Sequence, residues 1–335
     1  MSPVDLLDRP LRALRVSVTD RCNFRCPHCM PRGGSADRTG FLGCDEILSF
    51  DEIFRLVGIF VGLGVTKVRL TGGEPLLRDD LIYLILKLKQ LPGLQDVAIT
   101  TNGSLLQAMA VPLKDAGLDR LTVSLNSLHP GRFQEGSDSG LPLDRVINSL
   151  EAARVAGFKC IKINCVLRRG INDMDIVPLA TFAREKGYIV RFIEFMDVGT
   201  ENCWSLESVV PAVEVASIIC KQFPADRVWK KDSNCVSQHW RYKDGLGEFG
   251  LIASVTEPFC IDCDRARLSA DGSLYTCLFA SSSLNLNALI RGGMSTEDLS
   301  EVIRIHWRQR YDRYSEMRSE KTLNLPGAEM FHLGG

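Results

Sequence analysis

Apolar and polar positions repeat with two different periods between residues 11 and 196. Short runs that alternate with a period of two and are rich in β-branched residues predict strands. They lie at 14–19, 67–71, 97–100, 121–125, 160–166 and 189–195. Between them, segments with apolar residues three to four apart predict helices, among them 50–64, 78–89, 144–156 and 174–186. The order is that of repeated β/α units.

A closed (β/α)8 barrel needs eight such units in about 250 residues. The six units counted in residues 1–200 therefore predict an α/β fold, an incomplete (β/α)6 TIM-type barrel with an open side. Beyond residue 200 the pattern changes to a helix at 211–223, short β-like runs, and a charged helix at 295–311. We expect a smaller C-terminal α+β domain at 201–335.

Composition narrows the class of protein. The chain has 335 residues, of which 45% are hydrophobic and 24% charged, and its net charge is −1. Such a balance gives no general attraction to nucleic acid or to an acidic membrane surface. The apolar stretch at 56–65 is shorter than the roughly 20 residues that span a bilayer. We expect no nucleic-acid partner and no membrane association.

Three cysteines stand together directly after the first predicted strand. Cys22, Cys26 and Cys29 form a C-x3-C-x2-C run with Phe24 inside it. A four-iron, four-sulfur cluster ordinarily takes four Cys ligands, so three thiolates leave one iron open. The spacing resembles the signature of the radical S-adenosylmethionine (SAM) enzymes, in which the open iron chelates the amino and carboxylate groups of SAM.

Two alternatives compete for the same cysteines. A structural zinc site needs four ligands in a closed tetrahedron, and the nearby His28 lies cramped between Cys26 and Cys29. Disulfides need an oxidising compartment, but residues 1–12 show no basic start followed by an apolar core, as a secretory signal would. We therefore expect a cytoplasmic protein whose cysteines serve metal or redox chemistry.

A second set of three cysteines lies near the C-terminus. Cys260 and Cys263 form a C-x2-C pair, and Cys277 follows after thirteen residues. A turn at 269–273 predicts a hairpin that returns Cys277 to the pair. Alone, such a set is more typical of a zinc ribbon. Beside the first set, a second cluster with its own open iron explains it better.

The remaining six cysteines are scattered, several of them within apolar strand or helix patterns. Free Cys often serves as a small buried hydrophobe. We expect that role for Cys44, Cys160, Cys165, Cys203, Cys220 and Cys235.

Cations interrupt the predicted strands on one alternating face, whereas strands buried on both faces usually read as continuous apolar runs. Buried unpaired charge is costly, so these cations need anions, and a polyphosphate substrate fits. The alternative is that each cation is solvated or pairs with a helix carboxylate. The set comprises Arg15, Lys67, Arg69, Lys162 and Arg191 on strands, and Arg265 and Arg267 just past the second Cys pair.

Glycine motifs offer no second phosphate site. The chain has no G-x4-G-K-[ST] loop. Residues 245–250 match G-x-G-x-x-G but lack the strand–turn–helix context of a dinucleotide site, so we interpret them as a hairpin turn.

Together these motifs resemble the GTP 3′,8-cyclase family of radical SAM enzymes, also called the molybdenum cofactor biosynthesis protein A family. The resemblance rests on the first Cys set with Met30-Pro31, the Thr71-Gly-Gly-Glu-Pro75 loop, the second Cys set followed by Arg265-Ala-Arg267, and the terminal Gly334-Gly335. It runs from about Pro10 to the last residue. One departure is His28, because the family commonly has Tyr before the third Cys.

The resemblance implies two [4Fe-4S] clusters, one on Cys22, Cys26 and Cys29 and one on Cys260, Cys263 and Cys277. The first Cys set, Arg265 and Arg267 correspond to the catalytic residues. SAM contacts correspond to His28, Gly73, Ser124 and Met196. Contacts to GTP correspond to Arg15, Lys67, Arg69, Thr100, Lys162, Arg191, Arg265, Ala266 and Arg267.

The same resemblance implies the reaction. A 5′-deoxyadenosyl radical abstracts hydrogen from ribose C3′ of GTP, and the carbon radical attacks C8 to give (8S)-3′,8-cyclo-7,8-dihydroguanosine 5′-triphosphate, the first step of molybdenum cofactor biosynthesis. The second cluster meets the guanine base, and the Gly-Gly tail reaches the active site.

Partners implied by the resemblance are a flavodoxin- or ferredoxin-like reductant and cyclic pyranopterin monophosphate synthase as the next enzyme, and a homodimer is possible. Two other functions compete: a radical SAM peptide-modifying enzyme with an auxiliary cluster, and a zinc-stabilised binding module.

Overall fold

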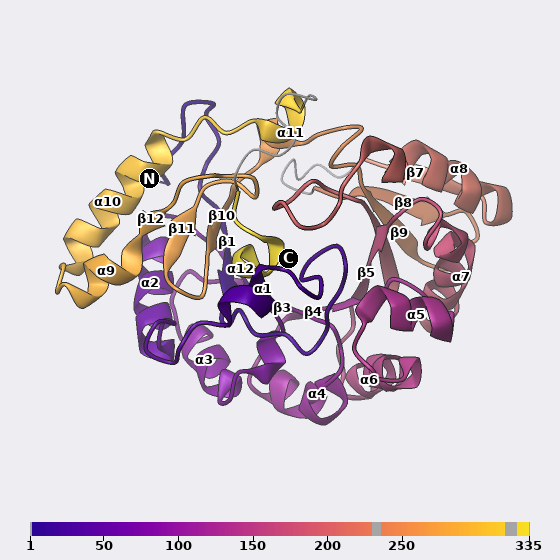
Figure 1. Ribbon diagram of the computed structural model, residues 1–335, viewed down its shortest axis with the longest axis horizontal. Helices are drawn as coiled ribbons and strands as arrows, with labels where there is room; N and C mark the ends of the chain where they lie inside the picture. The colour runs from indigo at the N-terminus through magenta and orange to yellow at the C-terminus, as the bar shows by residue number, and fades with distance from the viewer. Residues whose placement is uncertain (1, 230–235, 319–326, 335) are drawn as a thin grey trace.

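Six parallel strands, adjacent in chain order, form the centre of this computed structural model (Figure 1). They are β1 (Ala13–Ser17), β2 (Lys67–Thr71), β3 (Asp96–Thr101), β4 (Arg120–Ser124), β5 (Ile161–Leu167) and β6 (Ile189–Glu194). The structure describes residues 2–229, 236–318 and 327–334. The parallel order confirms the predicted partial barrel.

Strands from the C-terminal third extend this sheet at both edges. β10 (Arg265–Leu268) pairs parallel to β1, and β9 (Glu248–Ile252) pairs parallel to β6. Antiparallel strands follow outside them, β11 (Ser273–Tyr275) and β12 (Leu284–Asn285) beyond β10, and β8 (Gln238–Tyr242) and β7 (Ala225–Val228) beyond β9. The C-terminal α+β segment thus continues the barrel sheet, and a domain boundary at residue 200 stays a prediction.

Helices cover the outside of the sheet (Figure 1). Between or after the central strands lie α2 (Phe50–Gly62), α3 (Leu81–Leu88), α4 (Leu106–Asp115), α5 (Pro130–Ser137), α6 (Leu143–Val155), α7 (Ile176–Lys186) and α8 (Ala212–Gln222). The other helices are α1 (Ser35–Thr39), α9 (Leu286–Arg291), α10 (Thr296–Arg308), α11 (Tyr314–Met317) and α12 (Met330–Leu333). Within the described ranges, none is long and apolar enough to cross a bilayer.

Local sequence fixes where the first long helix begins. The Ser49 side chain accepts a hydrogen bond from the Glu52 N–H at 3.2 Å, and the Glu52 carboxylate accepts one from the Ser49 N–H at 2.7 Å. This reciprocal capping box satisfies two of the backbone donors that a helix N-terminus leaves unpaired. It explains why the predicted helix at 50–64 starts at Phe50.

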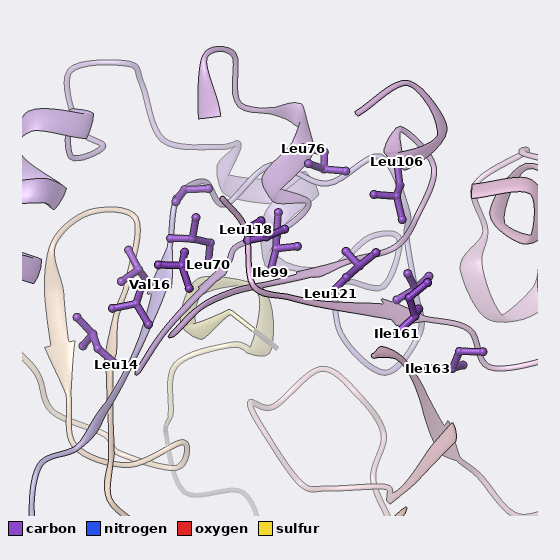
Figure 2. Packing of buried hydrophobic residues seen from close by; sticks show 14 of the residues in the cluster. Leu14, Val16, Leu70, Leu76, Ile99, Leu106, Leu118, Leu121, Ile161 and Ile163 are labelled. Atoms are coloured by element: carbon purple, nitrogen blue, oxygen red, sulfur yellow. The ribbon is translucent and has the colours of Figure 1, made fainter. Parts of the chain in front are cut away.

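The two faces of the central strands differ in polarity. Leu14, Val16, Leu70 and Ile99 are buried and belong to the main apolar cluster between the sheet and the helices (Figure 2). Because side chains alternate across a strand, the intervening residues, such as Arg15, face the interior of the open barrel. The core therefore lies outside the sheet, and the interior is left for polar chemistry.

Two further predictions have outcomes here. The hairpin that returns Cys277 to the Cys260 pair is confirmed by the antiparallel pairing of β10 and β11. The expectation that the scattered cysteines are buried is wrong for three of them, since loop or turn positions leave Cys44, Cys160 and Cys203 exposed. Cys165 is buried and Cys220 is half-buried, whereas Cys235 lies outside the described residues.

The core makes a stability prediction. Leu121 on β4 is fully buried (Figure 2), and Leu121→Ala leaves a cavity in the apolar cluster. We expect the free energy of unfolding in denaturant titrations to fall by about 2–5 kcal/mol. Val155→Ala, at a position that is 73% exposed, is the control and should change it by less than about 0.5 kcal/mol. Equal losses would contradict this packing.

Candidate active site

The first cysteine set lies on the loop after β1. Cys22, Cys26 and Cys29 are half-buried, and the backbone N–H of Phe24 donates to Cys22 Sγ at 3.4 Å. The Asn102 side-chain amide also approaches this sulfur, at 3.9 Å. N–H donors aimed at cysteine sulfurs are one of the means by which a protein tunes an iron–sulfur cluster.

Electrostatics indicates that these thiols need a cation. Burial raises the pKa of Cys22 to about 11, and burial together with the charge of Cys22 raises the pKa of Cys29 to about 12. The pKa of Cys26 is also raised, by burial and then by its two cysteine neighbours. Three thiolates would thus repel one another in a partly apolar setting. A bound iron cluster supplies the missing positive charge, so the donor set fits one.

Glycines let the loop after β2 pack directly on the cysteine loop. The Gly73 N–H donates to the Thr19 carbonyl at 2.7 Å, and the Glu74 N–H donates to the Arg21 carbonyl at 2.8 Å. A Cβ at Gly73 would overlap the Arg21 carbonyl, and one at Gly72 would lie 2.5 Å from the Thr19 oxygen. The close approach that glycine permits at Gly73 is therefore to the residue preceding Cys22.

Hydrogen bonds to the buried carboxylate of Glu74 connect the loop after β2 to the end of β3. Glu74 is 1% exposed and accepts hydrogen bonds from the Thr101 hydroxyl at 2.6 Å, the Asn102 N–H at 2.7 Å and the Leu76 N–H at 3.1 Å. Burial raises the pKa of Glu74 to about 7. Sequence reasoning placed both loops on one face but missed this bond, for which the only sequence signal is an acidic residue beside two glycines.

The remaining residues predicted to contact SAM lie around the same end of the barrel. Ser124 ends β4 and is half-buried, and Met196 follows β6, where its carbonyl accepts from the Asn202 side chain at 3.0 Å. His28 is half-buried, and burial followed by the charge of Arg168 lowers its pKa to about 4. A neutral imidazole therefore stands between Cys26 and Cys29.

The second cysteine set lies at the edge where β10 joins the sheet. Arg265 donates from Nη2 to Cys263 Sγ at 3.7 Å, and the Phe279 N–H donates to Cys277 Sγ at 3.5 Å. Burial raises the pKa of Cys277 to about 11. Burial also acts to raise the pKa of Cys263, but the charges of Arg265 and then Arg310 outweigh it and lower the value to about 6.

Neither cysteine set forms a closed site for one ion. Among the described residues, no three His, Cys, Asp or Glu side chains lie close enough together to hold a single metal ion. A structural zinc site requires four ligands at about 2.0–2.3 Å from the ion, and that arrangement is not found in the described part of the chain.

Arginines lie side by side on the interior face of three adjacent strands. In the sheet register, Arg267 on β10 is opposite Arg15 on β1, and Arg15 is opposite Arg69 on β2. Like charges directly opposite each other destabilise a sheet. Burial, followed by the charges of Arg267, Arg265, Arg69 and Arg191, lowers the pKa of Arg15. Five of the cations predicted from the sequence therefore share one interior, namely Arg15, Arg69, Arg191, Arg265 and Arg267.

Hydroxyl and amide groups orient this set. Arg69 Nη1 donates to the hydroxyls of Thr100 at 3.1 Å and Thr122 at 3.2 Å, and Arg191 Nε donates to the Asn164 side chain at 2.9 Å. Burial and then the charge of Arg191 lower the pKa of Arg69 to about 9. Thr122 and Asn164 were not predicted, and a polar residue at an inward strand position is the signal that could have found them.

Several of the interior cations have no carboxylate nearby among the described residues. In the ranges that the structure describes, Arg15, Arg69, Lys162 and Arg267 have no carboxylate at ion-pairing distance. Burial and then Arg191 lower the pKa of Lys162, and burial and then Arg265 lower that of Arg267 to about 10. Lys67 is exposed at the start of β2, and Ala266 is buried on β10.

The C-terminal tail enters the interior. Helix α12 lies inside the ring of strands in Figure 1, with Phe331 and Leu333 buried. Arg267 Nη1 donates to the Gly334 carbonyl at 3.1 Å. Gly334 has φ +71°, and a Cβ there would overlap the Thr71 side chain. Only glycine fits that position; Gly335 lies outside the described residues.

The glycines at 245–250 have a structural role. Gly245 and Gly247 lie between β8 and β9 with φ +79° and +103°, in agreement with the predicted hairpin turn. Gly250 lies opposite Arg191 in the sheet, and a Cβ there would be 3.0 Å from Arg191 Cγ. The third glycine makes room for an interior cation.

Comparison with known proteins gives two family matches and many relatives. The Radical SAM superfamily matches residues 16–183, and Molybdenum Cofactor Synthesis C matches residues 188–316. A GTP 3′,8-cyclase of Acidothermus cellulolyticus is 50% identical over 94% of this chain and 88% of its own length. Those of Xanthomonas campestris and Staphylococcus aureus are 46% and 43% identical, covering 99% and 95% of this chain and 97% and 94% of theirs.

Solved structures share the fold at low sequence identity. Streptococcus suis SuiB bound to S-adenosylmethionine superposes with a TM-score of 0.62 at 16% identity, covering 88% of this chain and 68% of SuiB. Native anSMEcpe with bound AdoMet and a peptide gives 0.58 at 16% identity, covering 97% and 88%. These similarities support the partial barrel and its C-terminal extension.

Packing of the Gly73 loop on the cysteine loop makes a binding prediction. In Gly73→Ala the added methyl group must push the loop away from the Arg21 carbonyl, and overpacking of this kind costs about 1–3 kcal/mol. We expect SAM to bind to the reconstituted protein roughly 10-fold more weakly in calorimetry, since 1.4 kcal/mol is a factor of ten. Gly136→Ala is the control, because no atom lies within 4 Å of a Cβ there. Equal SAM affinities in the two variants would show that close packing at Gly73 does not affect SAM binding.

Proposed function

Because the chain belongs to the GTP 3′,8-cyclase family, we propose that its two cysteine sets and interior cations form one active site for GTP. The family reaction converts GTP into (8S)-3′,8-cyclo-7,8-dihydroguanosine 5′-triphosphate, the first step of molybdenum cofactor biosynthesis. The chain is accordingly a radical SAM lyase that uses SAM and two [4Fe-4S] clusters. Which residues hold each group is the proposal.

The observation that carries this assignment is the row formed by Arg267, Arg15 and Arg69. Three guanidinium groups on neighbouring strands repel one another, and burial adds to the cost. A triphosphate relieves both, because guanidinium groups bind phosphate oxygens through paired, charge-assisted hydrogen bonds. Lys162 on β5, Arg191 on β6 and Arg265 on β10 add further cations near this row, and Lys67 at the exposed start of β2 can meet the outer part of the substrate.

Cys22, Cys26 and Cys29 would hold the first cluster, and Cys260, Cys263 and Cys277 the second. When bound, the first cluster and SAM supply the 5′-deoxyadenosyl radical that abstracts hydrogen from ribose C3′. The chain's own residues do the positioning. Glu74 and Asn102 fix the loops that face the first set, with Gly73, His28, Ser124 and Met196 around SAM.

Residues on β10, beside the second cysteine set, orient the guanine base and the C-terminal tail. Arg265 contacts the Cys263 sulfur, and Arg267 contacts the Gly334 carbonyl, so neighbouring residues on β10 link the second cysteine set to the C-terminal tail. With its base at this edge and its phosphates along the arginine row, GTP would be held at both ends. Fixing both ends restricts the ribose between them, which is how positioning lowers a barrier. Thr100 and Ala266 complete the lining.

The two competing functions explain the interior less well. A peptide-modifying radical SAM enzyme has no need of adjacent interior arginines that lack carboxylate partners among the described residues. A zinc-stabilised binding module would leave both those arginines and the open three-Cys sets without a role.

Partners follow from the reaction. Reductive cleavage of SAM requires an electron, and we propose a flavodoxin- or ferredoxin-like protein as its source and cyclic pyranopterin monophosphate synthase as the enzyme that takes the product. A homodimer and a cytoplasmic location stay predictions from the sequence.

Product analysis tests the reaction. Anaerobically reconstituted protein, incubated with SAM, a chemical reductant and GTP, should yield 5′-deoxyadenosine and a nucleotide isomeric with GTP, both measured by mass spectrometry. Omitting GTP is the control for uncoupled SAM cleavage. Absence of both products from protein that contains iron and sulfide would count against the function.

Loss of one interior cation tests the phosphate assignment. Within the ranges that the structure describes, Arg69 contacts only neutral hydroxyl and carbonyl groups, so Arg69→Ala removes its charge without leaving a carboxylate there unpaired. We expect GTP to bind about 10- to 100-fold more weakly, since a hydrogen bond to a charged group contributes about 1.5–3 kcal/mol. Arg154→Ala, on the outer surface with 54% side-chain exposure, is the matched control. Equal GTP affinities in the two variants would show that the phosphates bind elsewhere.

A further inference from the structure

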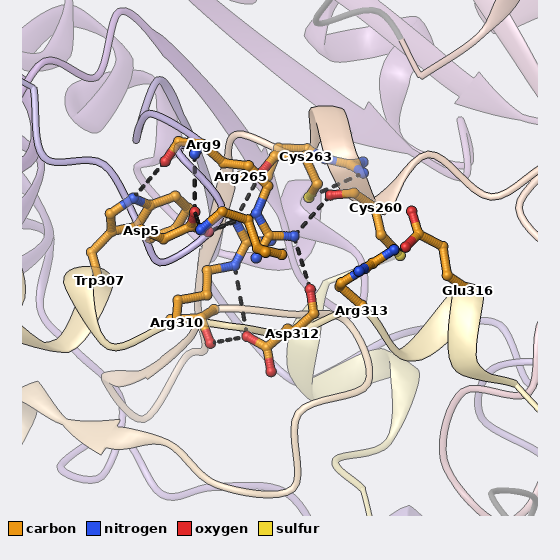
Figure 3. A network of polar contacts seen from close by, with 12 residues as sticks. Asp5, Arg9, Cys260, Cys263, Arg265, Trp307, Arg310, Asp312, Arg313 and Glu316 are labelled. Carbon is orange, nitrogen blue, oxygen red and sulfur yellow. Dashed lines mark hydrogen bonds and ion pairs between the residues drawn. The ribbon is translucent and has the colours of Figure 1, made fainter.

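The buried carboxylate of Asp5 binds two arginines, Arg9 four residues further along the chain and Arg310 near its other end. Asp5 accepts a hydrogen bond from Arg9 Nε at 2.6 Å and one from Arg310 Nη1 at 3.2 Å (Figure 3). The side chains of Asp5, Arg9 and Arg310 are 0%, 2% and 1% exposed. The Asp5 carboxylate also accepts from the Leu7 and Arg9 N–H groups, each at 2.9 Å, so it shapes the turn that presents Arg9.

Each of these arginines binds the backbone of one cysteine in the second set. Arg9 Nη1 donates to the Cys260 carbonyl at 2.8 Å, and Arg310 Nη1 donates to the Cys263 carbonyl at 2.7 Å (Figure 3). Both ends of the C-x2-C loop are thus fixed through a single carboxylate. Peptide carbonyls held by buried, charged donors form strong hydrogen bonds, so the loop has little freedom to move.

The third cysteine is attached to the same network. Arg9 Nη1 donates to the Asp312 carbonyl at 2.8 Å, and Arg310 Nε lies 3.6 Å from Asp312 Oδ2. That carboxylate oxygen accepts from the Thr276 hydroxyl at 2.6 Å, and Thr276 directly precedes Cys277. All three cysteines are therefore connected, through backbone or an adjacent residue, to four charged side chains.

Substrate binding does not account for this network. Arg9 pairs with Asp5, Arg310 pairs with Asp5 and Asp312, and both arginines donate to peptide carbonyls. Arg15, Arg69 and Arg267, in contrast, lack carboxylate partners within the described residues. Burying the charges of Asp5, Arg9 and Arg310 is costly, and Arg9 Nη2 has no hydrogen-bond partner among the described residues. In return, Arg9 and Arg310 form hydrogen bonds to the backbone of the cysteine loop.

We propose that Asp5, Arg9, Arg310 and Asp312 are positioning residues for the second cluster, which they act on through the backbone of its cysteines. The inference rests on the proposed assignment of Cys260, Cys263 and Cys277 as ligands. It makes residues 5–9, of which Arg9 lies 251 positions before Cys260, part of the second site. Partners behind the ligands commonly change metal affinity by about 10- to 100-fold when mutated.

The test uses a chain in which only the second site can hold iron. In a Cys22→Ala, Cys26→Ala, Cys29→Ala background, reconstituted protein should bind about four irons. Adding Asp5→Asn should make loss of this iron to a chelator roughly 10-fold faster and change the EPR spectrum of the reduced cluster. Asp8→Asn is the matched control, because Asp8 lies in the same turn, is exposed, and tolerates Asn at its φ of +59°.

A second pair of variants separates positioning from general stability. Arg310→Lys keeps the buried charge but cannot reproduce the planar fork, and should change the EPR spectrum and the rate of iron loss while circular dichroism stays unchanged. Arg308→Lys is its control, because Arg308 is exposed and lies two residues before Arg310. In the complementary Cys260→Ala, Cys263→Ala, Cys277→Ala background, Asp5→Asn should leave first-site iron and SAM binding intact.

The possible outcomes are distinct. If the parent lacking the first set binds no iron, the ligand assignment fails, and the positioning role fails with it. If the parent binds iron and both Asp5→Asn and Arg310→Lys match their controls in iron loss and EPR spectrum, only the positioning role is overturned. Equal loss of iron from both sites in Asp5→Asn, together with unchanged behaviour of Arg310→Lys, would show a purely structural role and would also overturn it.

Discussion

The fold has to hold several arginines side by side in the interior of its sheet. Arg267, Arg15 and Arg69 are adjacent in register, and their mutual repulsion acts against the pairing of β10, β1 and β2. The strands stay together because backbone hydrogen bonds and the apolar cluster on the opposite face outweigh that repulsion. A polyanion bound at these arginines, as proposed for the triphosphate, would relieve this repulsion and so stabilise the fold as well as position the reaction.

Much of the architecture could be predicted from the sequence. The strand at 67–71 has the predicted bounds, because alternation with β-branched residues marks a strand that is apolar on one face. The edge pairings could not be predicted: β10 has only four residues and β12 two, and short strands carry too little periodicity to indicate a partner. Nothing in the local sequence of residues 1–12 indicates a contact with the second cysteine set, because Arg9 reaches the Cys260 carbonyl across 251 positions.

The residue types of the candidate site could be predicted from the sequence, but the hydrogen bonds that join its residues could not. Spacing was enough to find both cysteine sets, and alternation was enough to find the interior cations. Hydrogen bonds from the Thr101 hydroxyl to Glu74 and from Arg9 to the Cys260 carbonyl join residues 27 and 251 positions apart, and no local pattern encodes such a pairing. Exposure was also misjudged for Lys67, which shares a face with Arg69 but lies at the open end of β2.

The pairing of C-terminal strands with both edges of the central sheet has a consequence for how the protein is made. During synthesis the first six strands emerge with β1 and β6 as open edges, and unpaired edges are templates for association with other chains. Their native partners, β10 and β9, come from the last third of the chain, so these edges stay open until translation is nearly complete. Long-range pairing of this kind slows folding and prolongs exposure to aggregation. The nascent chain is therefore exposed to association through these edges, and the first cysteine loop leaves the ribosome well before β10, which pairs with β1.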